Sequence, residues 1–206
     1  MIPPLVAVTP GDHGVSHELI SLLEAMAGAG LEMAILREPH LGERAYVALA
    51  RAVAQLLPAV VLHGKHPDAL EIAARAGFGL HLPAGADLHA ARRRVRGLLG
   101  ASCHSPLEVA AARSARCDYV ILSPIFSPTS KPGDSREPLG LAVLAEVCAA
   151  FDLPIAALGG IEPGRVAACR DAGAAAVAML GGLFPPDASP ESSAAAVLAC
   201  RAAWAS

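Results

Sequence analysis

Residues that bind anions or transfer protons gather where the short apolar runs of this sequence end. They are Asp12 and His13, Arg37 and Glu38, His63 and Lys65, His81, Ser102 and His104, and Ser130 and Lys131. Arginine presents a rigid fork of donors to a carboxylate or phosphate, and glutamate and histidine are general acids and bases. The opposite ends of the same runs carry mostly Pro, Gly and Ala. This asymmetry is the clearest functional signal in the sequence and predicts one site at that end of the fold.

Three histidines, His63, His81 and His104, close or directly follow successive apolar runs. For each one alone, a hydrogen-bonded structural histidine is the more common role, whereas three at one end of a fold indicate that at least one faces a ligand. The spacing contains neither His-x-His nor His-x-x-Glu, so it gives no support to a metal site built from all three. For Arg37-Glu38 the alternative is a salt bridge at the rim of the fold.

Two glycine pairs, Gly159-Gly160 and Gly181-Gly182, follow the last two apolar runs. Glycine lets the backbone approach a ligand and direct its N–H groups at it, so the pairs predict a phosphate cradle, with tight turns as the alternative. The longest loop, Ser123–Pro138, contains Ser130 and Lys131, a hydroxyl and a cation suited to phosphate. A solvated surface loop is the alternative there.

These residues need elements that bring the ends of the apolar runs together. The sequence alternates eight short aliphatic runs with eight longer, Ala-rich segments of helical periodicity. The predicted strands are Leu5–Thr9, Met33–Arg37, Ala59–His63, Gly79–Leu82, Gly100–Cys103, Tyr119–Leu122, Ile155–Leu158 and Ala175–Leu180. The predicted helices are Ser16–Ala29, Gly42–Leu57, Pro67–Ala76, Leu88–Gly97, Pro106–Ala115, Gly140–Phe151, Pro163–Ala172 and Pro190–Trp204. Eight such units without a linker predict one α/β domain over residues 1–206, a closed (β/α)₈ TIM barrel with its site at the C-terminal strand ends. A doubly wound open sheet is the alternative.

Composition argues against several other classes of protein. The 206 residues carry a net charge of −3, and the basic cluster Arg92–Arg94 with Arg96 lacks interleaved aromatics, so a solvated helix face is favoured over a nucleic-acid patch. Five widely spaced cysteines without a C-x-x-C pair indicate neither a disulfide scaffold nor a zinc site, and fit a reducing cytoplasm. We see no signal peptide and no apolar stretch long enough for a membrane span, so we expect a cytoplasmic protein without membrane or nucleic-acid partners. The Ala-rich outer helices leave a homodimer open.

Several short stretches, in their order and spacing, resemble one family. They are Ile35–Glu38, Gly79–Pro83, Gly100–Ser105, Asp118–Val120, Ser123–Phe126 with Ser130-Lys131, Pro138–Leu141, Ile155–Ile161 and Ala172–Ala174. Together they resemble the thiamine phosphate synthase/TenI superfamily of barrels, most strongly over roughly residues 100 to 180.

The resemblance implies a role for each matched position. Arg37 matches the arginine that contacts the anionic substrate, and Ser102, Ser130 and Lys131 match ligands of pyrophosphate or phosphate. Gly160, Gly181 and Gly182 fall where backbone N–H groups hold the thiazole phosphate. In the synthase, a pyrimidine diphosphate loses pyrophosphate, with Mg²⁺ neutralising the developing charge, and the thiazole nitrogen attacks the resulting cation.

The sequence also departs from the synthase pattern. Ile35 and Pro39 stand where synthases have Gln and Lys, and His63-Gly64 stands where they have Asn-Asp, whose Asp binds magnesium. Asp87 is a displaced candidate for a second acidic ligand. A glycine in place of a carboxylate removes an oxygen ligand from a hard cation, and such losses resemble the TenI branch.

Resemblance to the TenI branch implies a thiazole tautomerase, an isomerase that aromatises a thiazole carboxylate phosphate by metal-free proton transfer. It needs a phosphate cradle, an anion-binding group and an acid or base, and we expect these to be the glycine pairs, Arg37, and His104 before His63 or Glu38. The best-known tautomerase has a histidine at the position of Pro124. Synthases have a proline there, as this sequence does. We therefore expect no cofactor and a small phosphorylated thiazole as substrate. The alternatives are thiamine phosphate synthase, a transferase that uses Mg²⁺, and a non-catalytic binder of a thiamine-related phosphate.

Overall fold

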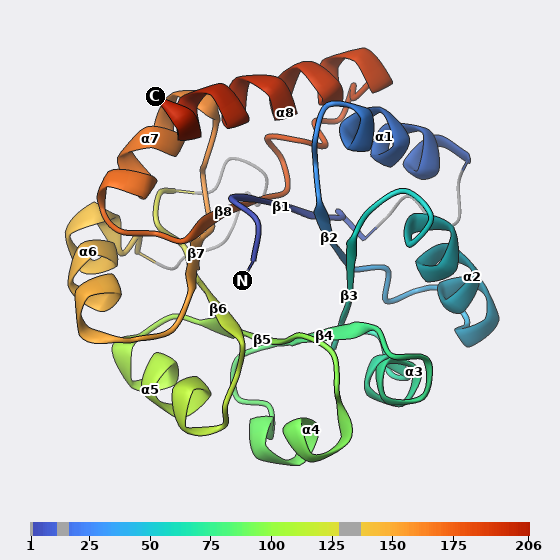
Figure 1. Ribbon diagram of the computed structural model, residues 1–206, viewed down its shortest axis with the longest axis horizontal. Helices are drawn as coiled ribbons and strands as arrows, with labels where there is room; N and C mark the ends of the chain where they lie inside the picture. The colour runs from blue at the N-terminus through green and yellow to red at the C-terminus, as the bar shows by residue number, and fades with distance from the viewer. Residues whose placement is uncertain (1, 12–16, 128–136) are drawn as a thin grey trace.

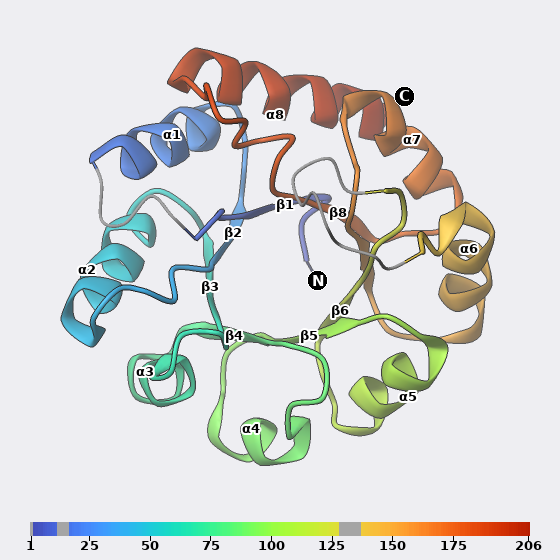
Figure 2. The same cartoon turned by 180° about the vertical axis from the view of Figure 1, so that it is seen from behind.

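The computed structural model describes residues 2–11, 17–127 and 137–206. Within them, eight parallel strands form a closed barrel inside a ring of eight helices, as Figure 1 and the reverse view in Figure 2 show. The strands are β1 (Leu5–Val8), β2 (Met33–Leu36), β3 (Ala59–His63), β4 (Gly79–Leu82), β5 (Leu99–Cys103), β6 (Tyr119–Leu122), β7 (Ile155–Ala157) and β8 (Ala176–Met179). The helices are α1 (His17–Gly28), α2 (Glu43–Val53), α3 (Ala69–Ala76), α4 (Leu88–Arg94), α5 (Pro106–Ser114), α6 (Gly140–Ala150), α7 (Pro163–Asp171) and α8 (Pro190–Ala205).

Strand order follows the sequence, and β8 pairs with β1 to close the barrel. The predicted (β/α)₈ TIM barrel is therefore confirmed, and the open sheet is wrong. Successive side chains of a strand point to opposite faces, which gives two apolar layers. Val6 and Val8 of β1 belong to the layer inside the barrel, whereas Leu5 and Ala7 pack against the helices. Both faces of each strand are covered, and this is why the strands read as continuous aliphatic runs.

The helix boundaries follow local signals. Ser105 accepts a hydrogen bond from the backbone N–H of Glu108 at 3.3 Å, as an N-cap does, and Gly77 ends α3 in the left-handed conformation with φ of 80°. Helix α2 ends at Val53 rather than at the predicted Leu57. Such shifts of a few residues leave the strand ends in place.

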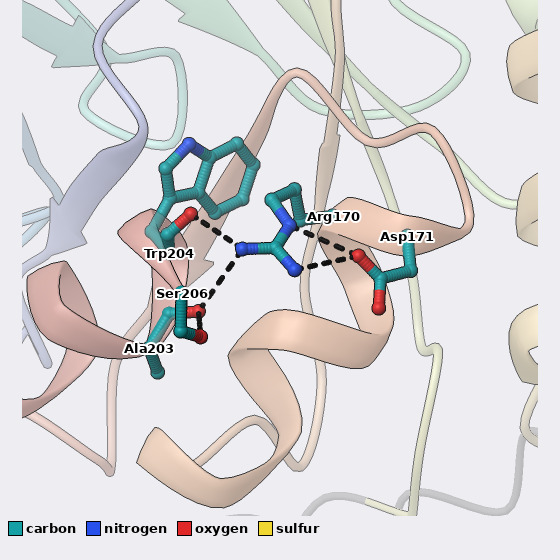
Figure 3. Close-up of polar contacts among 5 residues, drawn as sticks. All are labelled: Arg170, Asp171, Ala203, Trp204 and Ser206. Carbon is teal, nitrogen blue, oxygen red and sulfur yellow. Dashed lines mark hydrogen bonds and ion pairs between the residues drawn. The ribbon is translucent and has the colours of Figure 1, made fainter.

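An arginine fixes the end of the last helix. Helix α8 lies beside α1 and α7 in the ring (Figure 1). From α7, Arg170 Nη1 donates to the carbonyl of Trp204 at 2.7 Å, and its Nε and Nη2 donate to Asp171 Oδ1 at 3.0 and 2.7 Å (Figure 3). A cation placed on the last carbonyls of a helix complements the helix dipole.

Two arginines of the basic cluster form ion pairs with carboxylates on neighbouring elements. Arg92 pairs with Asp118 at 2.9 Å and Arg94 with Glu71 at 2.5 Å, which agrees with the solvated helix face expected of this basic cluster. All five cysteines are free thiols. In the described ranges, every helix is too short or too polar to cross a membrane.

Candidate functional site

A cavity of about 240 Å³ lies at the C-terminal ends of the strands. Most of the predicted site residues line it: Arg37, His63, Ser102, His104, Gly159, Gly160, Gly181 and Gly182. His81 and Lys65 line it as well. Ser130 and Lys131 lie outside the described residues. We call His63, His81 and His104 the histidine wall, and the four glycines the glycine wall.

Arg37 follows β2 and is anchored on the loop after β1. Its backbone N–H donates to Thr9 Oγ1 at 2.8 Å, and its Nη1 donates to the carbonyl of Pro10 at 2.5 Å. Gly11, with φ of 97°, makes this possible, because a Cβ there would lie 2.8 Å from Arg37 Nη1. The guanidinium is thereby oriented before any anion arrives, which suits a rigid donor fork.

Glu38 occupies a different environment from Arg37. Its side chain is fully buried and does not belong to the cavity lining, in keeping with the alternation of side chains along an extended chain. One carboxylate oxygen lies 3.9 Å from His40 Nε2. Burial, and to a lesser extent the charge of Glu38, raise the pKa of Tyr46, whose hydroxyl donates to the carbonyl of Leu36 at 2.5 Å.

His63 and His104 carry their hydrogens on different nitrogens. The backbone N–H of Lys65 donates to His63 Nδ1 at 3.0 Å, so neutral His63 is protonated at Nε2. His104 Nδ1 lies 2.6 Å from the carbonyl oxygen of Ser123, which can only accept, so neutral His104 is protonated at Nδ1 and basic at Nε2. The backbone N–H of His104 donates to Glu108 at 2.5 Å and fixes the start of α5. Two imidazoles of the histidine wall thus differ in their neutral tautomer, with the hydrogen on Nε2 in His63 and on Nδ1 in His104.

His81 lies deepest in the histidine wall. Its Nδ1 is 3.2 Å from Tyr119 Oη and its Nε2 is 2.9 Å from Ser102 Oγ. Burial, followed by the nearby charge of His63, holds the pKa of His81 well below its ordinary value. His81 is therefore a neutral hydrogen-bonding group rather than a proton carrier near neutral pH.

Backbone conformation creates the glycine wall. Gly159 and Gly160 have φ of 107° and 58°, and a Cβ on Gly160 would lie 2.5 Å from the carbonyl of Ser127. Within residues 2–11, 17–127 and 137–206, no protein acceptor takes the N–H of Gly160, Gly181 or Gly182. These N–H groups are therefore available to an anion, as in the phosphate cradles of other barrels.

Arg165 supports the glycine wall, and the sequence reasoning missed it. Its Nη1 donates to the carbonyl of Gly160 at 2.6 Å, and its guanidinium lies 4.8 Å from the ring centre of Phe126. Both contacts hold the Gly160 peptide against the loop after β6. The signal in the sequence was an arginine in the first turn of α7, five residues after Gly160.

The described residues do not fit a magnesium ion. A Cβ on Gly64 would lie 2.7 Å from Leu82 Cδ2, so a side chain there would meet the end of β4. Asp87 is the N-cap of α4 and accepts from the backbone N–H of Ala90 at 2.8 Å. Among the residues that the structure describes, no three His, Cys, Asp or Glu side chains are grouped to hold a metal ion. Among the described residues, Arg37 and Lys65 are the cationic side chains that line the cavity.

Comparison with known proteins places this geometry in context. Residues 5–183 match the model of the family described as thiamine monophosphate synthase. A putative thiamine-phosphate synthase of Geobacter sulfurreducens is 31% identical over 95% of this chain and 92% of its own length. The thiamine-phosphate synthase of Chromobacterium violaceum is 36% identical over 89% of both chains. A thiamine biosynthesis bifunctional protein ThiM/ThiE of Symbiobacterium thermophilum is 37% identical over 86% of this chain, which spans only 37% of that protein.

Solved structures with the same fold include a thiamine phosphate pyrophosphorylase from Pyrococcus furiosus. It superposes with a TM-score of 0.78 at 19% identity, covering 98% of this chain and 95% of that one. The corresponding protein of Bacteroides thetaiotaomicron gives a TM-score of 0.67 at 22% identity. At these identities the likeness concerns the fold alone.

Proposed function

The chain belongs to the thiamine monophosphate synthase family, and from that premise we propose that it is a thiamine-phosphate synthase. It would join a pyrimidine diphosphate to a phosphorylated thiazole and release pyrophosphate. The names of its relatives favour this transferase over the tautomerase expected from the sequence. The observation that carries the proposal is a single cavity that holds a backbone anion cradle and two cationic side chains.

Strand order places the two anion-binding groups on different parts of the barrel rim. The glycine wall follows β7 and β8, whereas Arg37 and Lys65 follow β2 and β3. In the closed ring β3 lies four strands from β7, so Lys65 and the Gly159-Gly160 pair lie on opposite sides of the barrel, whereas only β1 separates β2 from β8. The cradle would hold the thiazole phosphate, and the two cations would bind the diphosphate and stabilise the charge that develops as pyrophosphate leaves. These residues supply charge where the described carboxylates do not fit a metal.

A direct assay tests the synthase proposal. The full chain is incubated with hydroxymethylpyrimidine diphosphate and thiazole phosphate, with Mg²⁺ or with EDTA, and thiamine phosphate is measured by chromatography. We expect product, and we expect Lys65→Met to raise the KM for the diphosphate about five- to tenfold. Arg44→Met, a change of an exposed cation on α2, is the matched control. No product above the buffer rate under either condition would refute this function.

A second candidate is the thiazole tautomerase, and the geometry of His104 favours it. The bond from Nδ1 to the Ser123 carbonyl makes Nε2 the basic nitrogen, and His63 carries its hydrogen on Nε2. One imidazole would take a proton from the thiazole ring and the other would return a proton elsewhere on it, so the ring becomes aromatic with no net change in atoms. Neither step requires a metal.

Ultraviolet absorbance distinguishes the two reactions. The non-aromatic thiazole carboxylate phosphate is mixed with the protein in EDTA, and aromatisation is followed over time. A rate above that of buffer supports the tautomerase, and a rate equal to buffer removes it. A chain that binds thiazole phosphate but passes neither assay would be the non-catalytic binder.

A further inference from the structure

Strand register brings Tyr119, His81 and Ser102 together inside the barrel. His81 of β4 lies beside Gly100 of β5, and Gly100 lies beside Tyr119 of β6. A Cβ on Gly100 would stand 2.2 Å from Cζ and 2.6 Å from Oη of Tyr119. The missing side chain therefore lets the phenol reach across β5 to His81. Ser102 lies two residues further along β5 and so on the same face.

Two hydrogen bonds link these three residues, which we call the relay. Tyr119 Oη lies 3.2 Å from His81 Nδ1, and Ser102 Oγ lies 2.9 Å from His81 Nε2. Tyr119 is fully buried and His81 is 1% exposed, whereas Ser102 is half-buried and lines the cavity. The relay therefore begins in the core and ends at the site.

The two hydrogen bonds of the relay can have either of two donor–acceptor directions. Burial keeps His81 neutral, and its ring centre lies 5.5 Å from that of His63. A neutral imidazole has one N–H and one acceptor nitrogen. Either Tyr119 donates to His81 and His81 donates to Ser102, or both hydrogen bonds run the other way.

The buried phenol decides between these directions. Across the described part of the chain, the only partner of the Tyr119 hydroxyl is His81. If His81 donated to Tyr119, the phenol hydrogen would be buried without an acceptor, which is costly. Tyr119 therefore donates to Nδ1, and Nε2–H donates to Ser102. Since Ser102 Oγ accepts from His81, its own hydrogen is left for the cavity.

We propose that the relay fixes Ser102 as a hydrogen-bond donor, so that this part of the cavity selects a ligand atom with a lone pair. A phosphate oxygen or an unprotonated ring nitrogen meets that requirement, and an N–H group does not. Ser102 is then a specificity-determining residue, and His81 and Tyr119 are positioning residues. The inference rests on the proposed function only in assigning the cavity to the substrates.

NMR of the ligand-free protein, labelled with ¹⁵N in its imidazoles, tests the direction. We expect His81 to be protonated at Nε2 and unprotonated at Nδ1, with its signals assigned by their loss in His81→Gln. Ser102→Ala should keep this tautomer, whereas Tyr119→Phe, which preserves the ring, should remove the preference. A protonated Nδ1 in the wild type, or a tautomer that changes with Ser102 rather than with Tyr119, would overturn the proposal.

Calorimetric titration with inorganic pyrophosphate tests the consequence at the cavity. We expect Ser102→Ala to weaken binding about tenfold, and Tyr119→Phe to weaken it about threefold alone but not in the Ser102→Ala background. Tyr46→Phe is the matched control, because that buried hydroxyl bonds backbone groups of Leu36 and His63, and its effect should be equal in both backgrounds. Equal losses from Tyr119→Phe in both backgrounds would contradict the relay. If both enzyme assays fail, the expected tautomer of His81 and the expected losses of pyrophosphate affinity stay the same. If pyrophosphate does not bind, the assignment of the cavity to the substrates is refuted. The NMR experiment still decides the direction of the relay in that case.

Discussion

The two walls of the cavity present different chemical groups, backbone amides in the glycine wall and imidazole side chains in the histidine wall. The glycine wall presents backbone N–H groups, and its geometry depends on positive φ angles at Gly159 and Gly160. The histidine wall presents side chains, and its chemistry depends on which ring nitrogen of each imidazole has a fixed partner. A backbone wall has no charge to titrate and suits an anion at any pH. A histidine wall can transfer protons, because a neutral imidazole has one N–H and one acceptor nitrogen.

Replacing the imidazole proposed as acid or base of the tautomerase should give the largest effect and leave the glycine wall intact. His104→Gln removes the basic Nε2, and we expect the rate constant for aromatisation to fall about 10²- to 10³-fold, with phosphate affinity changed less than twofold. His89→Gln, at an exposed position on α4, is the matched control. Equal aromatisation rates in the two variants would remove His104 as the acid or base.

A methyl group on the glycine wall should impair binding and stability together. In Gly160→Ala the new Cβ would lie 2.5 Å from the Ser127 carbonyl at a φ of 58°, so we expect a loss of about 2–3 kcal/mol in the free energy of unfolding and at least tenfold weaker phosphate binding. Gly164→Ala in α7, where no atom lies within 4 Å, should be neutral or slightly stabilising. Denaturant unfolding and calorimetry measure both quantities. Similar results for the two alanines would mean that the cradle is not built as described.

Lowering the pH should destabilise the fold through the buried imidazole of His81. The pKa of His81 is lowered in the fold from about 6.5 in the unfolded chain, so below about pH 6.5 the unfolded state binds a proton that the folded state does not. As the pH falls from there toward the folded pKa, His81 should cost up to about 1.4 kcal/mol of stability per pH unit. His81→Asn should flatten the profile by that amount, and exposed His89→Asn should not. A His81→Asn profile parallel to the wild type would contradict the buried neutral imidazole.

A substitution at the end of the barrel opposite the cavity should change the free energy of unfolding and leave ligand binding unchanged. Arg170→Met removes the donor to the last carbonyls of α8 (Figure 3), and we expect a loss of about 1 kcal/mol in the free energy of unfolding. Pyrophosphate affinity should stay within twofold of the wild type, since Arg170 lies outside the cavity lining. A larger change in affinity would show that the two ends of the barrel are coupled.

Much of this site was predictable because parallel strands bring distant residues to one rim. The spacing of apolar runs predicted the barrel, and the residues after each run identified Arg37, His63, His104 and both glycine pairs as cavity residues. Glu38 shows the limit of that reasoning. A position one residue beyond Arg37 reverses the direction of the side chain, and its carboxylate is buried outside the cavity lining. The roles assigned to Ser130 and Lys131 stay predictions.

The sequence by itself determined the order of strands and helices, the end of the barrel that carries polar groups, and the two glycine pairs after the last two strands. Periodicity and local conformation follow from short stretches of chain, so they can be read there. Tertiary structure alone decided that Gly100 admits the Tyr119 phenol, that His63 and His104 are protonated on different nitrogens, and that Gly64 faces the end of β4. Each of these depends on which strand lies beside which and in what register, and hydrogen bonds between residues far apart in the chain form only once the barrel has closed.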